Sequence, residues 1–100
     1  MKVVLRPGAV TDVRAARDHY EEAKPGLGGE FATELDRLFE RLAVFPRSAP
    51  YVAGYEPVRR AHLRRFPFAV FFQVSDADQI VVLRVIHTAR SPERWPRGET

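Results

Sequence analysis

The fold is decided by residues 68–87, which read FAVFFQVSDADQIVVLRVIH. Every second residue from Phe68 to Val74 is apolar and falls on one face of a strand, because side chains alternate across a strand with a period of two. The run from Gln79 to His87 is apolar on both faces, which is typical of a central strand. Between them, residues 75–78 are short polar side chains and alanine, a composition typical of tight turns. We therefore expect two strands joined by a turn.

Two amphipathic helices are expected before these strands. Apolar residues recur at spacings of three and four over residues 9–23, and Asp12 lies near the positive end of that helix. Residues 26–29, which contain three glycines, are expected to form the connection between the helices. A second stripe runs over residues 31–45, and Pro46 ends it. Two such helices joined by a short connection predict an antiparallel hairpin.

The remaining segments complete an α+β fold. A first strand is expected at residues 3–5, a proline-rich loop at 46–57 and another strand at 58–66. The predicted order is strand, helix, helix, strand, strand, strand, with the helical hairpin packed on a mostly antiparallel sheet. The length of 100 residues predicts a single domain over residues 1–100.

The composition excludes several classes of protein. The chain has no cysteine, so disulfide scaffolds, thiolate zinc sites and cysteine nucleophiles are ruled out. Three scattered histidines without carboxylates at a fixed spacing predict no metal site, and no cofactor motif is present. No apolar run approaches the roughly 20 residues that cross a bilayer, and the charged N-terminus is unlike a signal peptide. We expect a cytoplasmic protein with no membrane partner.

The positive charge is concentrated in the second half of the sequence. The net charge is 16 − 13 = +3, and residues 1–50 contain as many acidic as basic side chains. Residues 57–75 contain no acid, and their basic residues are Arg59, Arg60, Arg64 and Arg65. Arginine binds phosphate and carboxylate through paired hydrogen bonds. This basic segment favours a nucleic acid or an acidic protein as partner, and a solvated arginine-rich face without a partner is the alternative.

Short motifs follow one another in order along the predicted elements. They are Ala9, Asp12, Ala16, Tyr20-Glu21-Glu22, Pro25-Gly26-Leu27-Gly28, Phe31, Phe45-Pro46, Arg60, residues 63–72 (LRRFPFAVFF), Val85-Ile86-His87, Arg90, Pro92 and Trp95. As an ordered set, these motifs resemble the RelE/ParE toxin superfamily of bacterial type II toxin–antitoxin systems, on its ParE-like, plasmid-stabilisation side. The resemblance covers residues 3–96.

The resemblance implies a small growth-inhibiting toxin that a cognate antitoxin holds inactive. RelE-type members are ribonucleases that cut messenger RNA on the ribosome, whereas ParE-type members poison DNA gyrase without known hydrolytic chemistry. The first hypothesis is a ParE-like toxin that binds gyrase. The second is a ribosome-dependent endoribonuclease with a replaced catalytic set. The third is an inactive relic that still binds an antitoxin.

The residues that RelE-type chemistry requires are only partly present. Cutting RNA without a metal requires a group that takes the 2′-hydroxyl proton, cations on the phosphate and an acid for the leaving oxygen. By this resemblance, the first two basic residues of the RelE-type catalytic set correspond to Arg60 and His62, and a later arginine of that set corresponds to Arg90. It places Ala69 where a second arginine is expected. Residues 95–96 are a tryptophan and a proline where a tyrosine is expected, so the first hypothesis is favoured.

If the chain is a ribonuclease, the catalytic candidates are Arg60, His62, His87 and Arg90. Histidine titrates near neutral pH and can act as a base. The alternative for His87 is a strand-end imidazole bonded to backbone, and the alternative for His62 is an exposed strand residue.

A partner-binding surface is expected on the side of the sheet away from the helices. If the even-numbered strand residues share that side, Arg60, His62 and Arg64, with Arg84 as a further candidate, form a cationic groove there. Arg84 lies in an apolar run, so it lies either on an open face or against an acid. The alternative for Trp95 is packing on the domain itself. The candidate partner-binding residues are Arg60, Arg64, Arg84, Arg90, Arg94 and Trp95, and the candidate partners are an antitoxin and gyrase or, for a ribonuclease, the ribosome and messenger RNA.

Overall fold

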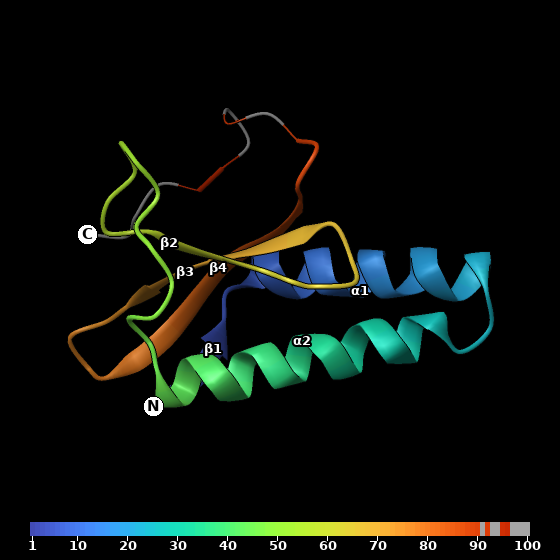
Figure 1. Cartoon of the computed structure of the whole chain (residues 1–100), viewed down its shortest axis with the longest axis horizontal. Helices are drawn as coiled ribbons and strands as arrows, with labels where there is room; N and C mark the ends of the chain where they lie inside the picture. The colour runs from blue at the N-terminus through green and yellow to red at the C-terminus, as the bar shows by residue number, and fades with distance from the viewer. Residues whose placement is uncertain (91, 93–94, 97–100) are drawn as a thin grey trace.

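The computed structural model describes residues 1–90, 92 and 95–96. The elements are β1 (Lys2–Leu5), α1 (Pro7–Ala23), α2 (Leu27–Val44), β2 (Arg59–His62), β3 (Phe68–Val74) and β4 (Gln79–His87). The strand order is β1-β4-β3-β2, with β1 parallel to β4 and the other pairs antiparallel. The two helices lie side by side as an antiparallel hairpin on one face of the sheet (Figure 1). The predicted α+β fold is confirmed.

The helical hairpin turns earlier than the glycines suggested. The connection expected at residues 26–29 is wrong, because α2 already begins at Leu27. Among the three glycines of residues 26–29, Gly26 alone adopts a left-handed conformation, with φ of 91°, and it makes the turn. The Glu21 carboxylate accepts hydrogen bonds from the backbone N–H groups of Gly26 and Gly28, at 2.9 and 3.1 Å. These bonds satisfy N–H groups at the start of α2 that have no partner within the helix.

The strand expected at residues 58–66 ends at His62, and the next residues turn onto the helices. One oxygen of Glu34 on α2 accepts hydrogen bonds from the backbone N–H groups of Arg64 and Arg65, at 2.9 and 3.1 Å. These groups therefore point at α2 instead of extending a strand. β3 and β4 have the bounds that the sequence predicts.

The sheet is covered on both faces by apolar side chains. On the helix side, Tyr20 and Phe31 pack their rings on Phe66 and Phe68, with centroids 4.8 to 6.1 Å apart. The opposite side, here called the far face, carries a second buried cluster made of Val52, Val58, Ala69, Phe71, Val81, Leu83 and Ile86. Neither helix, among the described residues, is long and apolar enough to cross a bilayer.

β4 contains an irregularity that changes which of its side chains face the helices. Arg84 pairs with Phe71 and Val82 pairs with Phe72, so Leu83 is an extra residue with no opposite partner. Val82 and Val85 both pack in the helix-side core, three residues apart instead of two or four. Such a bulge shifts the alternation of a strand by one residue. Because of the bulge, Val85 and not the charged Arg84 occupies the next position in the helix-side core.

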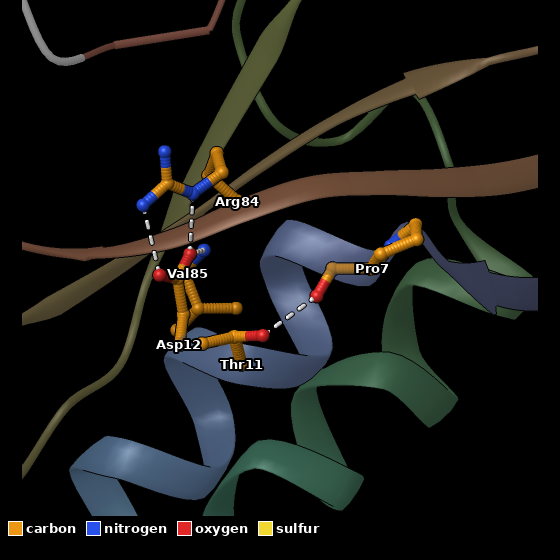
Figure 2. A network of polar contacts seen from close by, with 5 residues as sticks. All are labelled: Pro7, Thr11, Asp12, Arg84 and Val85. Atoms are coloured by element: carbon orange, nitrogen blue, oxygen red, sulfur yellow. Dashed lines mark hydrogen bonds and ion pairs between the residues drawn. The ribbon is translucent and has the colours of Figure 1, made fainter.

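Asp12 on α1 binds this part of β4 at three points (Figure 2). Its carboxylate accepts hydrogen bonds from Nε and Nη2 of Arg84, at 2.7 and 2.9 Å, and from the backbone N–H of Val85, at 2.9 Å. β1 pairs with β4 only as far as Leu5, opposite Val82. Asp12 therefore supplies an acceptor to β4 beyond the end of its neighbouring strand. The hydrogen bonds that Arg84 donates to Asp12 raise the pKa of the Arg84 guanidinium, so this side chain stays charged.

Adjacent glycines in α2 should respond in opposite ways to alanine. A Cβ on Gly28 would lie 2.7 Å from the backbone oxygen of Arg17 on α1, whereas a Cβ on Gly29 would meet nothing within 4 Å. We expect Gly28→Ala to lower the free energy of unfolding by about 2 kcal/mol, because the helices must separate. Gly29→Ala should raise it by about 0.5 kcal/mol through helix propensity. Urea denaturation measures both, and equal effects would contradict the close helix contact.

Removing the Asp12 carboxylate should destabilise the domain. We expect Asp12→Ala to lower the free energy of unfolding by about 2 kcal/mol, since it leaves Arg84 and the Val85 N–H without their acceptor. The Arg84 side chain is 37% exposed, so water offsets part of the loss. Asp18→Ala, at an exposed position of the same helix, should change stability by less than about 0.5 kcal/mol. Equal losses in urea denaturation would show that the network contributes nothing.

Candidate interaction surface at the far face and free edge of the sheet

Arg60 and His62 project from β2 to the far face. Ala61 between them packs in the helix-side core, and side chains alternate along a strand. They line a small cavity of about 80 Å³, here called the far-face cavity. Its other lining residues are Ala69, Phe71, Ile86, His87, Thr88 and Trp95. His62 is paired with Ala69, which in turn is paired with Ile86, so a row of facing residues crosses three strands below the cavity.

Trp95 packs over the far face, as the alternative to a partner contact predicts. Its ring centroid lies 5.4 Å from that of Phe71 and 5.8 Å from that of Tyr55. The Arg60 guanidinium lies 4.9 Å from the Trp95 ring centroid, within the range of a cation–π interaction. The half-buried Arg60 cation and the indole therefore hold each other in place beside the cavity.

The two strand histidines have different surroundings. His62 is exposed at the end of β2, whereas His87 is half-buried at the end of β4. Nδ1 of His87 accepts a hydrogen bond from the backbone N–H of Ala89 at 3.1 Å, and the ring packs on Phe68 with centroids 5.3 Å apart. A nitrogen that accepts a hydrogen bond carries no proton, so the neutral imidazole carries its proton on Nε2. The backbone-bonded alternative for His87 matches this geometry.

The structure brings three of the four ribonuclease candidates together. Arg60, His62 and His87 line the far-face cavity, and Arg90 lines the neighbouring cleft between α1 and the end of β4, where His87 also contributes. A cation and two imidazoles can hold an anion and exchange a proton. Among the described residues, no group of three or more histidines and carboxylates could hold a metal ion.

The other expected partner-binding residues are not at this cavity. Arg84 is held by Asp12, so it is not part of a free cationic groove. Its position follows the acid-paired alternative, because both of its bonds run to the Asp12 carboxylate on α1. Arg64 lies in the turn after β2, with its side chain exposed. Arg94 lies outside the described residues.

A second cluster of cations lies beside the outer edge of β2. Two clefts there share Arg41 and His62 and form one continuous surface, here called the edge groove. One cleft is lined by Arg41, Leu42, Phe45, Ser48, Ala49, Pro50, Arg60, Ala61 and His62, and the other by Glu34, Arg37, Leu38, Arg41, His62, Leu63, Arg64 and Arg65. The sequence analysis missed Arg37 and Arg41, because helix periodicity marks them only as solvent-facing.

Comparison with known proteins identifies the family. The family model described as "ParE toxin of type II toxin-antitoxin system, parDE" matches residues 3–92. The chain belongs to the ParE toxin family. A solved structure described as a chromosomal ParDE TA system from P. aeruginosa is similar to it, with a TM-score of 0.75 and 25% sequence identity. The match covers 87% of this chain and 95% of that one. No curated protein matches the chain.

Family membership confirms the predicted resemblance. The sequence motifs indicated the RelE/ParE superfamily and its ParE-like side, and both the family and the fold agree. As a ParE-family chain, this protein is the toxin component of a type II toxin–antitoxin system. An antitoxin partner follows from that kind of system.

The contact between Arg60 and Trp95 can be measured directly. Trp95 is the only tryptophan, so intrinsic fluorescence reports on it alone. We expect Arg60→Ala to increase quenching of this fluorescence by iodide and to lower the free energy of unfolding by about 1 kcal/mol, the magnitude of a cation–π interaction. Arg47→Ala, at an exposed loop position, is the matched control and should change neither. Unaltered quenching in Arg60→Ala would contradict the packing of the indole on Arg60.

Proposed function

We propose that this ParE-family toxin arrests bacterial growth by binding DNA gyrase, and that a cognate antitoxin neutralises it. The match of the ParE family model to residues 3–92 carries this proposal. ParE-type members of the superfamily act on gyrase, as the resemblance to them implies. The contact surface that we propose includes Arg60 and Trp95, because a guanidinium packed on an indole is typical of the residues that dominate protein interfaces.

The floor of the far-face cavity supports a binding role over hydrolysis. Ala69 lies there, opposite His62 in the neighbouring strand, and its side chain is buried. An alanine offers no hydrogen bond and no charge to a scissile phosphate. Trp95 lines the same cavity with a ring whose N–H neither gives nor takes a proton in catalysis. The cavity therefore lacks two of the groups that RelE-type cleavage uses.

A ribonuclease remains the second candidate, and one observation favours it. Arg60, His62 and His87 line a single cavity although they come from β2 and from the end of β4. In this alternative, one imidazole takes the 2′-hydroxyl proton, the other protonates the leaving oxygen, and Arg60 binds the phosphate. Arg90 would extend the cationic surface toward the cleft beside α1.

The two candidates predict different results when the protein is expressed from an inducible promoter in a bacterial host. For gyrase binding, we expect growth arrest with induction of the DNA-damage response, and the purified protein should inhibit supercoiling of relaxed plasmid by gyrase. Arg60→Ala should weaken this inhibition about tenfold, because a buried interface arginine contributes that much binding energy. Arg14→Ala, on the exposed side of α1, should leave it unchanged.

Mapping of cleavage sites in messenger RNA tests the ribonuclease alternative. Cleavage of messenger RNA on ribosomes, lost in both His62→Ala and His87→Ala while supercoiling is unaffected, would replace gyrase binding with the ribonuclease. Normal growth during expression of verified folded protein would contradict both and favour the relic. Co-expression of a cognate antitoxin should restore growth under either active candidate.

A further inference from the structure

The last part of β4, beyond the end of β1, carries a backbone N–H group without an acceptor. The N–H of Val85 points away from β3 and donates to Asp12, whereas the N–H of Thr88 points toward β3 and donates to Pro67 at 2.8 Å. Because N–H directions alternate along a strand, the N–H of His87 points away from β3, as that of Val85 does. Among the described residues, no hydrogen bond of this His87 N–H occurs.

His87 lines the cleft between α1 and the end of β4, here called the α1–β4 cleft. The cleft has a volume of about 380 Å³, which lies within the range of small-molecule sites, about 300 to 1,000 Å³. Its apolar wall consists of Ala15 and Ala16 on α1 and of Phe68 and Val85 on the sheet. The two sheet residues belong to the helix-side core, so the α1–β4 cleft lies on the other side of the sheet from the far-face cavity.

Arg90 adds a cation to the same cleft. Its backbone N–H donates to the backbone oxygen of His87 at 3.0 Å, so the turn after β4 brings Arg90 back to the strand end. The Arg90 side chain is exposed and forms no ion pair among the described residues. His19 lines the cleft from α1. Asp12 is the one acid among the described lining residues, and both of its oxygens already accept hydrogen bonds from β4. The cleft therefore offers donors that no acid of the described chain takes.

The contact of Asp12 with β4 shows which chemical group fits such donors (Figure 2). There, one carboxylate accepts a hydrogen bond from the Val85 N–H at 2.9 Å and two from the Arg84 guanidinium. Two residues further along β4, the His87 N–H and the Arg90 guanidinium offer the same two kinds of donor at the α1–β4 cleft. Guanidinium groups bind planar carboxylates through paired hydrogen bonds, and such charge-assisted bonds are the strong ones. The open donors therefore match a carboxylate from outside the chain.

We propose that the α1–β4 cleft is a binding site for a small organic acid with an apolar body. Its carboxylate accepts hydrogen bonds from the His87 N–H and the Arg90 guanidinium, and its body packs on Phe68 and on the alanines of α1. An acid with an apolar body fits better than inorganic phosphate, because only the former removes the apolar wall from water. The site goes beyond the proposed function and is independent of it, since neither Arg60 nor His62 lines this cleft.

Two matched probes test the site on the full chain. The acid probe is 3-phenylpropanoate, and the neutral probe is 3-phenylpropanamide, which has the same apolar body without the charge. By amide NMR, we expect saturable binding of the acid with a dissociation constant of about 1 mM, ordinary for a ligand of this size, and with the largest shift at the His87 N–H. The amide should bind at least about tenfold more weakly, because hydrogen bonds to a charged group are the stronger ones. The affinity for the acid should fall as salt rises.

Substitutions separate the charge from the apolar wall. Arg90→Ala should weaken binding of 3-phenylpropanoate about tenfold through the lost charge-assisted bonds. Ala15→Leu, at an exposed position of α1 that lines the cleft, should weaken binding of the acid at least about fivefold, because the larger side chain fills the space of the ligand. Arg47→Ala removes the same charge from an exposed loop position outside the cleft and should change the affinity less than about twofold. Circular dichroism and thermal melting check that all three variants are folded.

Four results would overturn the organic-acid site. The first is the absence of saturable shifts with 3-phenylpropanoate at about ten times the expected dissociation constant. The second is binding of the neutral amide as tightly as the acid, and the third is a largest shift away from His87 and Arg90. The fourth is tighter binding of inorganic phosphate than of 3-phenylpropanoate, which would make the cleft a site for phosphate alone. All four are measured on purified protein, so none depends on growth arrest or on the target.

Discussion

The position of the sheet under the helices depends on the contact of one carboxylate, that of Asp12, with the part of β4 that β1 does not reach. Beyond Val82, β4 has no strand on that side, and a strand without a neighbour leaves backbone N–H groups unsatisfied. Asp12 accepts one of them, from Val85, and the same carboxylate neutralises Arg84. A helix thus completes the hydrogen bonding of a strand, which fixes α1 on β4 in one register.

Contacts within the domain determine which cations are available for binding. Arg84 is held by Asp12, and Arg65 forms an ion pair with Glu30 at 2.8 Å. The buried Arg59 donates to the backbone oxygen of Ala49. These three arginines are committed to the domain's own groups. Beside the edge of β2, the arginines that form no ion pair among the described residues are Arg37, Arg41, Arg60 and Arg64.

The sequence predicts the elements well because hydrophobic periodicity reports burial directly. Residues 79–87 are apolar on both faces, and they form the central strand β4 with the expected bounds. The connection at residues 26–29 could not be predicted, because Gly28 is required by contact with Arg17 on another helix and not by a turn. The partner of Arg84 was left open for a similar reason. A bulge is a property of strand pairing, and local composition does not reveal it.

The candidate site, like the fold, was predicted only in part from the sequence. A local count places the excess charge in residues 57–75, since that window contains no acid. In the folded chain, α2 supplies two of the cations beside β2, Arg37 and Arg41, from the half of the sequence whose charges cancel. A count of charges along the sequence does not show which charges lie close together in the folded chain. A partner is affected only by the balance of charge in space. Glu34 is the one acid among the residues that line this edge, so a single carboxylate faces several arginines and the edge of β2 is a basic surface. A net charge of +3 for the whole chain therefore understates how basic this one edge is.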